Sequence, residues 1–552
     1  MHIVIASSSN GAVLTPVGDD GVAAAPSAVT TAALPAEVAR LERDSPRWVW
    51  ESTELWYPSL LRAGVRVARC VDLRLCHAIL RNSEASAGSA LASAPPSSWD
   101  LPPGEVAKAM PDALFDFDTT PDASEGLDPL AEFLLQQQAL TPRLSLLLAA
   151  ESAGALAAVE MRFAGLPWRA DLHDELLTRT LGPRPRPGER PVLMEEVLGA
   201  LRLTLDAPSL NPDSQPELLR ALRRAGLMVS STSKWELQEL EHPAVAPLLE
   251  YKRMARLLSA NGWHWLETNV RDGRFHPDYV PAGVVTGRWA SKGGGGALQL
   301  PKQVRGAVVA DPGRKLVVAD ASQLEPRILA GMAADRGMIE AGSAGDLYAG
   351  IVASGAVGTR EQAKIAMLGA MYGATSGESG RLMPALERAY PRAIALVEAA
   401  ARAGERGQKV STLLGRGSPL PDAQWHQVQA EASEESAAVS AQSRARSQAR
   451  SWGRFTRNFV VQGTAAEWAL CWMAALRGSL YALGGRSPLL EAPHLVFFMH
   501  DELVIDTEAR HADAVVAAVE EAAATAGRLL FGELPVRFPL TIAVVDSYAD
   551  AK

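Results

Sequence analysis

The sequence contains little cysteine and no long apolar segment at its start. Only Cys70, Cys76 and Cys471 occur among 552 residues, and no two of them have the short spacing of a structural zinc site. The first residues, MHIVIASSSNGAV, have neither a basic lead nor a long apolar run, so we expect neither a signal peptide nor a membrane anchor. These features predict a cytoplasmic protein that makes no contact with a membrane.

Positive charge is also scarce. The chain has 54 lysines and arginines against 63 acidic residues, which gives a formal net charge of -9. This balance argues against a protein whose whole surface binds nucleic acid, although one basic cleft in an acidic body gives the same sum. With 47% hydrophobic and 21% charged residues, the composition is typical of a globular protein with several domains and a large core.

One apolar strand in the middle of the chain ends in an acid. The strand Leu316–Ala319 runs into Asp320, and Glu325 follows at the expected start of a helix. A bare carboxylate at a buried strand end costs on the order of several kcal/mol unless a cation or hydrogen-bond donors accompany it. Asp320 is therefore predicted to be a ligand, with a helix cap as the alternative.

A second apolar strand far downstream also delivers acids. The segment PHLVFFMHDELVI turns at His500 and presents Asp501 and Glu502. We expect the two strands to bring their acids to one place, although HDEL could also be a simple turn. Carboxylates with no cysteine and only one nearby histidine form an oxygen-rich site, which suits magnesium or manganese rather than zinc.

A cationic helix lies between these two strands in the sequence. The helix expected from Arg360 to Gly373 places Arg360 and Lys364 on one face, with Tyr372 two turns further along. Such a pair alone is usually a solvated surface. Combined with an acidic metal centre, it predicts a polyphosphate site, where a protein supplies positioning and charge neutralisation.

The rest of the chain indicates an α/β protein with low-complexity segments. The glycine-rich stretch at 286–301 has the wrong spacing for a nucleotide-binding loop. The expected elements are a strand at 2–6, a small α/β unit at 48–80, a linker at 82–128, helices at 130–177, 192–224, 248–262 and 344–382, a loop or charged helix at 430–450, and strand, helix and strand over 493–545.

Six motifs in a fixed order carry a resemblance to a known family. They are TGR at 286–288, DASQLEPR at 320–327, REQAKIAMLGAMYG at 360–373, VSTLLGR at 410–416, RFTRNFVVQGTAAE at 454–467 and HDEL at 500–503. From about residue 190 onward the chain resembles the polymerase region of family A DNA polymerases, the DNA polymerase I type. DASQLEPR and HDEL are similar to its two palm motifs, and REQAKIAMLGAMYG is similar to its fingers helix.

The resemblance implies a fold of the α/β (α+β) class. It would be a right-hand polymerase with palm, fingers and thumb, preceded by a small RNase H-like exonuclease-type α/β domain. The implied domains are a degenerate exonuclease-like domain at 1–140 with its linker near 82–128, thumb and start of palm at 141–305, palm at 306–335, fingers at 336–453, and palm again at 454–552.

The resemblance also implies a role for each matching residue. Asp320 and Asp501 would hold two Mg²⁺ ions, or Mn²⁺, with Glu502 in support. Arg360 and Lys364 would grip the triphosphate, and Lys364 would give a proton to pyrophosphate. Glu325 would be the steric gate against the ribose 2'-hydroxyl, Tyr372 would close on the nascent pair, and His500 would contact the nucleotide or primer end. Gln323 and Leu368 would complete the nucleotide site, and primer and template would contact Thr286, Arg288, Gln299, Arg454, Asn458 and Gln462.

Three positions depart from the family pattern. Leu368 stands where the family has an aromatic residue, which predicts altered sugar discrimination, including poor use of dideoxynucleotides. Ala321 also replaces an aromatic residue, and Pro326 replaces an aliphatic one. A proline in the first turn of a helix is tolerated. No metal-ligand position is lost.

The amino-terminal region lacks the acidic motifs of a proofreading exonuclease. The first strand has no Asp-x-Glu, and Asp116 and Asp118 imitate one only within the expected linker. We therefore expect no 3'-5' exonuclease activity, and no room for a 5'-nuclease domain. Leu114 and Phe115 in the same linker could dock on a sliding clamp, but an incidental apolar island is the favoured interpretation.

These observations together predict a monomeric, nucleoid-associated DNA polymerase. It would add dNTPs to the primer 3' end of primer-template DNA by two-metal phosphoryl transfer, in DNA repair or gap filling. A non-catalytic DNA-binding protein on a polymerase fold is one alternative, since Ala321, Pro326 and Leu368 depart from the family pattern. A 3'-5' exonuclease is the other.

Overall fold

The fold is taken from a computed structural model that describes residues 1–101, 127–238, 240–292, 300–374, 377–434 and 437–551. Backbone contacts divide the chain into two compact units. The first comprises Met1–Ala164, Asp278–Lys292 and Gly313–Val544, and the second comprises Gly165–Pro277, Gly293–Pro312 and Val545–Lys552. All candidate site residues that are described lie in the first unit.

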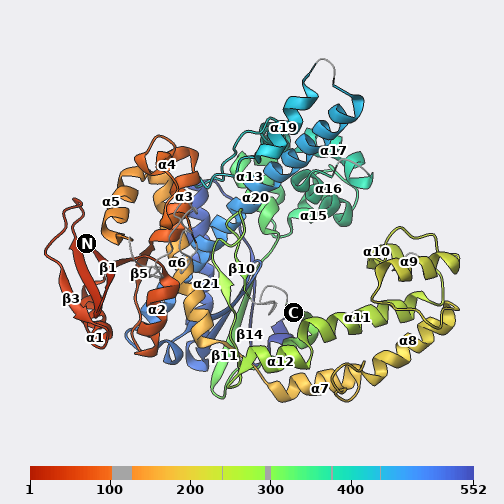
Figure 1. The fold of residues 1–552 in the computed structure, drawn as a ribbon, viewed down its shortest axis with the longest axis horizontal. Helices are drawn as coiled ribbons and strands as arrows, with labels where there is room; N and C mark the ends of the chain where they lie inside the picture. The colour runs from red at the N-terminus through yellow and green to blue at the C-terminus, as the bar shows by residue number, and fades with distance from the viewer. Residues whose placement is uncertain (102–126, 239, 293–299, 375–376, 435–436, 552) are drawn as a thin grey trace, which may run out of the picture. The chain divides into compact units, whose positions relative to one another are not determined.

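A four-stranded sheet in the first unit carries both predicted acids. Its order is β12-β13-β11-β14, and Figure 1 shows β11 and β14 within it. Strands β11 and β13 are antiparallel, and their register runs from Arg314 opposite Glu508 to Asp320 opposite Glu502. The two predicted apolar strands are thus confirmed. The bounds are β11 Arg314–Ala321, β12 His494–Met499, β13 Glu502–Glu508 and β14 Leu540–Val545.

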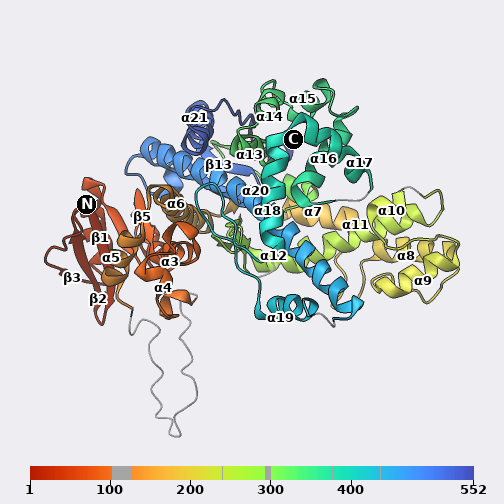
Figure 2. The ribbon, with the colours of Figure 1, turned by 90° about the horizontal axis from the view of Figure 1, so that it is seen from above.

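Helices in the same unit form a large hydrophobic core. Leu329, Ile351, Met367, Val397 and Phe459 belong to one buried cluster, and Figure 2 shows α16 beside α17 and α18 beside α20. The bounds are α13 Leu324–Ala333, α14 Arg336–Ala341, α15 Leu347–Ala353, α16 Arg360–Tyr372, α17 Gly377–Ala389, α18 Pro391–Glu405, α19 Ala423–Ala432, α20 Val439–Gly484 and α21 Ala512–Phe531.

The amino-terminal part of the first unit has its own mixed sheet. The order is β3-β2-β1-β4-β5, with β1, β4 and β5 parallel and β1, β2 and β3 antiparallel. This confirms the first strand and the small α/β unit. The bounds are β1 His2–Ser8, β2 Gly11–Val17, β3 Ser27–Thr30, β4 Arg47–Trp50, β5 Arg69–Asp72, α1 Leu34–Leu41, α2 Thr53–Arg62, α3 Leu73–Asn82, α5 Pro129–Ala139 and α6 Pro142–Ala164.

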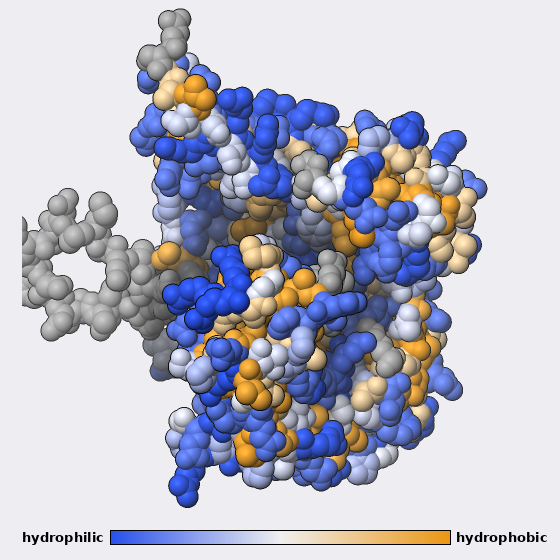
Figure 3. Space-filling view, turned by 90° about the vertical axis from the view of Figure 1, so that its right-hand side faces the viewer, coloured by the Kyte–Doolittle hydropathy of each residue, from blue (hydrophilic) through white to orange (hydrophobic). Residues whose placement is uncertain are grey.

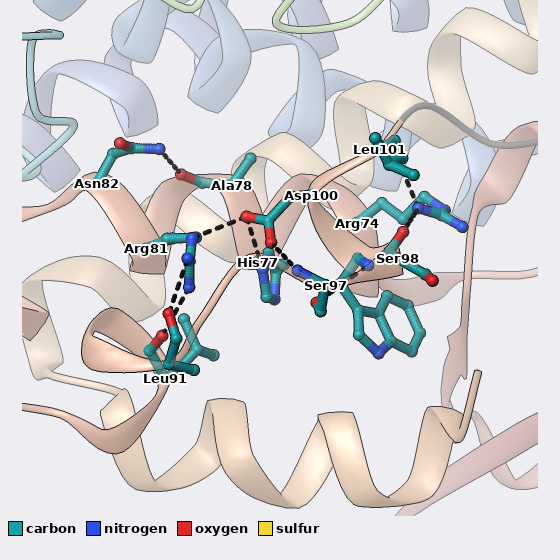
Figure 4. Close-up of polar contacts among 12 residues, drawn as sticks. Arg74, His77, Ala78, Arg81, Asn82, Leu91, Ser97, Ser98, Asp100 and Leu101 are labelled. Carbon is teal, nitrogen blue, oxygen red and sulfur yellow. Dashed lines mark hydrogen bonds and ion pairs between the residues drawn. The ribbon is translucent and has the colours of Figure 1, made fainter. Parts of the chain in front are cut away.

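The first part of the expected linker is structured. Helix α4 (Ala90–Ser93) follows α3, and side chains of α3 reach the next segment (Figure 4). Arg74 donates to the carbonyls of Ser98 and Leu101 at 2.8 and 2.6 Å, and Arg81 Nε lies 2.7 Å from Asp100 Oδ1. The sequence hides these contacts because they use backbone carbonyls and single polar groups rather than apolar periodicity. Leu114, Phe115, Asp116 and Asp118 lie outside the described residues.

Two buried ion pairs join helix α6 to later parts of the first unit. Arg477 on α20 pairs with Glu160 on α6 at 2.8 Å, and Arg416 pairs with Glu151 on the same helix. All four side chains are buried. Helix α6 is therefore tied to α20 and to the segment around Arg416 by contacts that are costly to break.

Helices α6 and α20 are long and apolar enough to cross a membrane by length and composition alone. However, 72% and 83% of their most apolar windows are buried inside the structure. On the face drawn in Figure 3, hydrophilic residues predominate and apolar residues form scattered groups. Packing within the unit accounts for the composition of both helices.

The second unit is mainly helical. Trp168, His173, Trp265 and Phe275 form an aromatic cluster with ring centroids 5.1 to 5.9 Å apart. The bounds are α7 Ala170–Leu181, α8 Val192–Thr204, α9 Gln215–Arg224, α10 Lys234–Gln238, α11 Val245–Asn261, α12 Trp263–Asn269, β6 Leu166–Pro167, β7 Val270–Arg271 and β8 Arg274–Phe275.

Some predicted elements differ from those observed. The helix expected over 192–224 is two helices, because Pro208 and Pro212 lie between α8 and α9 and a proline interrupts helical hydrogen bonding. The helical region expected over 130–177 is interrupted after Ala139, whereas the end of α6 at Gly165, whose φ is 68°, agrees with the glycine expected to close that helix. The segment 430–450 contains the end of α19, up to Ala432, and is helical again from Val439. The α/β class is confirmed, whereas the domain boundaries stay predictions.

Candidate active site

Two acids from distant parts of the sequence lie at neighbouring strand ends. Asp320 is the register partner of Glu502, and the amide of Ala321 donates to the carbonyl of Asp501 at 3.0 Å. Asp320 and Asp501 are half-buried, whereas Glu502 is buried. The β11–β13 ladder thus brings the two candidate metal ligands to the same end of the sheet.

A tight turn positions Asp501. Only His500 and Asp501 connect β12 to β13, with Met499 opposite Glu502. His500 has a φ of 60°, as two-residue hairpins require, although this conformation is costly for a residue other than glycine. Burial, and then the charge of Arg288, lower the pKa of His500. The imidazole is therefore neutral near pH 7.

The acids fit the donor set of magnesium. Within the described ranges, no group of three or more histidine, cysteine, aspartate or glutamate side chains is placed to hold a metal ion. Magnesium requires fewer protein ligands, because it keeps several waters and binds through one or two carboxylates together with substrate phosphates. Asp320 and Asp501, on adjacent strand ends, are suited to that mode of binding.

Helix α16 presents one face to solvent. Thr359 caps it by accepting a hydrogen bond from the amide of Gln362 at 3.1 Å. Four of the exposed positions recur every four residues, with Glu361 and Ile365 exposed beside them, and the opposite face is buried in the core. The resulting stripe consists of the four predicted nucleotide-binding residues Arg360, Lys364, Leu368 and Tyr372.

Glu325 connects three distant motifs. Its Oε2 accepts a hydrogen bond from the hydroxyl of Tyr372 at 2.7 Å, and its Oε1 pairs with Arg288. Burial, and then the hydrogen bond to Glu325, raise the pKa of Tyr372 to about 12, so the hydroxyl stays protonated and donates. The predicted steric gate is therefore held by the TGR motif on one side and by α16 on the other.

The predicted DNA-binding residues on α20 also form a stripe. Arg454, Asn458 and Gln462 recur every four residues and keep solvent access among buried neighbours. Arg288 is 40% exposed at its side chain, whereas Thr286 is buried. Gln299 lies outside the described residues.

The departures from the family pattern have distinct surroundings. Ala321 is buried at the end of β11, and Pro326 is buried in the first turn of α13, where its missing N–H removes no helical hydrogen bond. Leu368 is 37% exposed on the α16 stripe. Only Leu368 therefore lies where a bound nucleotide could touch it.

Sequence reasoning missed Asp346. Its Oδ2 lies 2.7 Å from Nε of Arg360, and its Oδ1 accepts a hydrogen bond from Nε2 of Gln323 at 2.7 Å. The available signal was an aspartate directly before the α15 pattern, which is the usual sequence of a helix cap. That signal predicts a cap but no link to the site.

The chain is similar to known proteins of one family. The model of DNA polymerase family A matches residues 218–550. The thermostable DNA polymerase I of Thermus thermophilus is 28% identical over 348 residues, which cover 57% of this chain and 37% of that protein. The thermostable DNA polymerase I of Thermus aquaticus is 25% identical over 455 residues, covering 75% of this chain and 46% of that protein. The chain thus spans less than half the length of either relative.

A solved structure supports the fold. The polymerase domain of Pol1 from M. smegmatis, in complex with DNA primer-template and dNTP, superimposes with a TM-score of 0.68 at 19% sequence identity, over 100% of this chain and 95% of that one. At this identity the likeness concerns the fold alone. With the family model matched over more than half of the sequence, the chain belongs to DNA polymerase family A.

Proposed function

We propose that this protein is a DNA-templated DNA polymerase that adds dNTPs to a primer 3' end. One observation carries the proposal: Asp320 and Asp501 lie at adjacent strand ends of a sheet, and the same unit contains helix α16, which exposes Arg360 and Lys364 on one face. The names of the relatives, and the primer-template DNA and dNTP bound to the solved neighbour, support primer-template DNA and dNTPs as the partners.

Each group has a defined task in this proposal. Arg360 and Lys364 bind the triphosphate, and Lys364 gives a proton to the leaving pyrophosphate. Glu325 blocks a ribose 2'-hydroxyl while Tyr372 and Arg288 hold its carboxylate in place. Arg454, Asn458 and Gln462 contact the minor groove, where shape and common acceptors rather than sequence are read.

Metal dependence is a property of the family, and the ions we propose are magnesium. Asp320 and Asp501 would hold two Mg²⁺ ions, with Mn²⁺ as a substitute and Glu502 in support. When bound, such ions lower the pKa of the primer 3'-oxygen and neutralise the pyrophosphate. The carboxylates contribute by holding that charge at the strand ends next to the triphosphate-binding helix.

Primer extension tests the proposal directly. The wild type should extend a labelled primer with dNTP and Mg²⁺, and Asp501→Ala should not. Asp513→Asn, which changes an exposed acid at the start of α21, serves as the control and should extend normally. Extension by Asp501→Ala at the wild-type rate would refute the metal assignment. Salt-sensitive DNA binding without incorporation under any metal would favour a non-catalytic DNA-binding protein instead.

We also propose that proofreading is absent. In the amino-terminal part, Glu51 forms an ion pair with Arg74, and Asp72 accepts hydrogen bonds from two backbone amides. These structural contacts occupy acids that could otherwise be the metal ligands of an exonuclease, which supports the proposal. A 3'-labelled primer incubated with Mg²⁺ but without dNTP should keep its label. Loss of the label would revive the exonuclease alternative.

Sugar selection is a finer expectation at the α16 stripe. Because Leu368 stands on that stripe in place of an aromatic residue, we expect poor use of dideoxynucleotides, and Glu325 should exclude rNTPs. Extension with ddNTP or rNTP as competitors of dNTP measures both. Leu368→Tyr should improve ddNTP incorporation, and an unchanged ratio would contradict the assignment. Action as a monomer in repair or gap filling, at the cytoplasmic nucleoid, remains part of the proposal.

A further inference from the structure

The orientation of Arg360 is fixed from outside its own helix. Its Nε donates to Oδ2 of Asp346 at 2.7 Å, and its guanidinium carbon lies 5.6 Å from the ring centre of Tyr348. The side chain is otherwise 53% exposed. A carboxylate at one edge and an aromatic ring beneath the plane together restrain a side chain that would be free to rotate in solvent.

Asp346 is itself held firmly. Its Oδ1 accepts hydrogen bonds from the amides of Tyr348 and Ala349 at 3.0 and 3.2 Å, which caps α15, and from Nε2 of Gln323 at 2.7 Å. Burial acts to raise its pKa, but the hydrogen bonds from Arg360 and Gln323 outweigh burial and lower the pKa to about 2. The carboxylate is therefore ionised at any working pH.

Gln323 connects Asp346 to the catalytic strand. Its Oε1 accepts from the amide of Leu347 at 2.8 Å and from Nη2 of Arg327 at 3.3 Å. It lies three residues after Asp320 and has a φ of 55°, a conformation that persists only where the surroundings determine it. Hydrogen bonds from Gln323 to Asp346 and from Arg360 to Asp346 therefore link the Arg360 side chain to the end of the strand that carries Asp320.

The ion pair with Asp346 leaves the two Nη groups of the Arg360 guanidinium available. Asp346 occupies Nε, and neither Nη nitrogen of Arg360 has a hydrogen-bond partner among the described residues. The two Nη groups form a fork that matches two phosphate oxygens. Lys364 is exposed one turn further along the same face.

We propose that Asp346 is a positioning residue for the nucleotide triphosphate, acting through Arg360. This inference rests on the proposed function, because it assigns the ligand of Arg360 as the triphosphate of a dNTP. Asp346 keeps the guanidinium fork pointing outward from α16. Gln323, at the end of β11, holds Asp346 in place by donating to its Oδ1. If Asp346 instead competed with phosphate for Arg360, its replacement would lower the KM for dNTP.

The first test is Asp346→Asn. The asparagine Oδ1 can still cap α15, but the charge that holds Arg360 is lost. The KM for dNTP should rise about fivefold, as expected when an exposed cation loses the ion pair that restrains it, with kcat changed less than KM and with unaltered primer-template affinity. Asp171→Asn breaks a similarly exposed pair with Arg169 in the second unit and should leave the KM unchanged.

A double-mutant comparison decides whether the effect passes through Arg360. In an Arg360→Ala background, Asp346→Asn should change the KM for dNTP no further. A lowered or unchanged KM in the single variant, or the same fivefold rise in the Arg360→Ala background, would overturn the inference. Thermal unfolding of each variant identifies a merely structural loss.

Equilibrium binding separates this inference from the proposed function. The dissociation constant of a correctly paired dNTP is measured with Mg²⁺ on a primer that ends in a dideoxynucleotide, so that no chemistry follows. A wild type that binds dNTP but does not extend a normal primer would refute the polymerase proposal alone. Binding that Asp346→Asn does not weaken would refute the positioning role alone, and a wild type that binds no dNTP would refute both.

Discussion

The two sheets of the first unit use carboxylates in opposite ways. Asp72 ends β5 opposite donors, since its oxygens accept from the amides of Thr53 and Leu75 at 2.7 and 3.1 Å. Asp320 ends β11 opposite another acid, Glu502. Asp72 thereby caps α3, although burial raises the pKa of its carboxyl, whereas the half-buried Asp320 and Asp501 lie at one end of the four-stranded sheet. The strand-end acid thus caps a helix in one sheet, and in the other we propose that it binds a cation.

This contrast predicts its largest effect at Asp320. Asp320→Asn should lower single-nucleotide incorporation on the order of 10³-fold, because several kcal/mol of transition-state charge stabilisation are lost and each ~1.4 kcal/mol is a factor of ten. The midpoint of thermal unfolding should change little, because asparagine keeps the size of this half-buried side chain. Rapid-quench kinetics and calorimetry measure the two quantities. A large fall in the unfolding midpoint would show that Asp320, like Asp72, mainly stabilises the fold.

The next effect concerns Glu160, which faces a cation instead of an acid. Glu160→Gln should lower the free energy of unfolding by about 3–5 kcal/mol, because Arg477 is left buried with only a neutral partner. Incorporation per folded molecule should be retained. Urea unfolding measures the loss, and Glu521→Gln, which breaks an exposed pair with Arg528, should show no measurable change. Equal effects of the two substitutions would contradict the assigned burial.

A pH effect is expected at Glu467, a buried acid on α20. Burial raises its pKa from 4.5 to about 7, although Thr412 and the amide of Leu414 donate to it. The folded state thus favours the protonated form. The resulting stability is fully present below pH 4.5 and is lost as the pH rises through 7, by about 3 kcal/mol.

Glu467→Gln should remove this dependence. The amide stays neutral, so the variant should gain stability relative to the wild type between pH 4.5 and 7 and keep a constant advantage above that range. Urea unfolding at several pH values measures the difference. A difference that does not vary with pH would show that Glu467 is not protonated in the folded state.

The smallest effect is expected at Asp72. Asp72→Ala should cost about 1–2 kcal/mol through the loss of a helix cap, and Asp72→Asn should cost less because its Oδ1 can still accept. Neither substitution should alter incorporation or the retention of a 3' label. If Asp72→Ala instead reduced a measurable exonuclease activity, Asp72 would also have a catalytic role, and the contrast between the two sheets would be wrong.

Much of the catalytic sheet could be predicted from the sequence. Continuous apolar runs at 316–319 and 493–499 identify buried strands, and acids directly after them point to one strand end. The helical period of Arg360, Lys364 and Tyr372 predicts their common face. These signals suffice because strand and helix periods fix which side chains point in the same direction.

Other parts of the site left no local signal. Arg288, Glu325 and Tyr372 meet from three motifs, and only the tertiary fold brings them together. Asp346 looks like an ordinary helix cap. The first turns of α20, rich in serine and arginine, lack the apolar period that predicts a buried helix, and packing of its later turns determines that the helix continues.

Helix α20 is long enough to connect two distant parts of the first unit. The helix carries Arg477, which is anchored to Glu160, and Arg454, which is expected at the DNA, about 35 Å away at ~1.5 Å per residue. The turns around Arg454 are also held locally, because Thr456 donates to the carbonyl of Ala400 on α18 at 2.8 Å. Helix α20 is thus restrained at two separate points, so loss of one contact should leave the other in place.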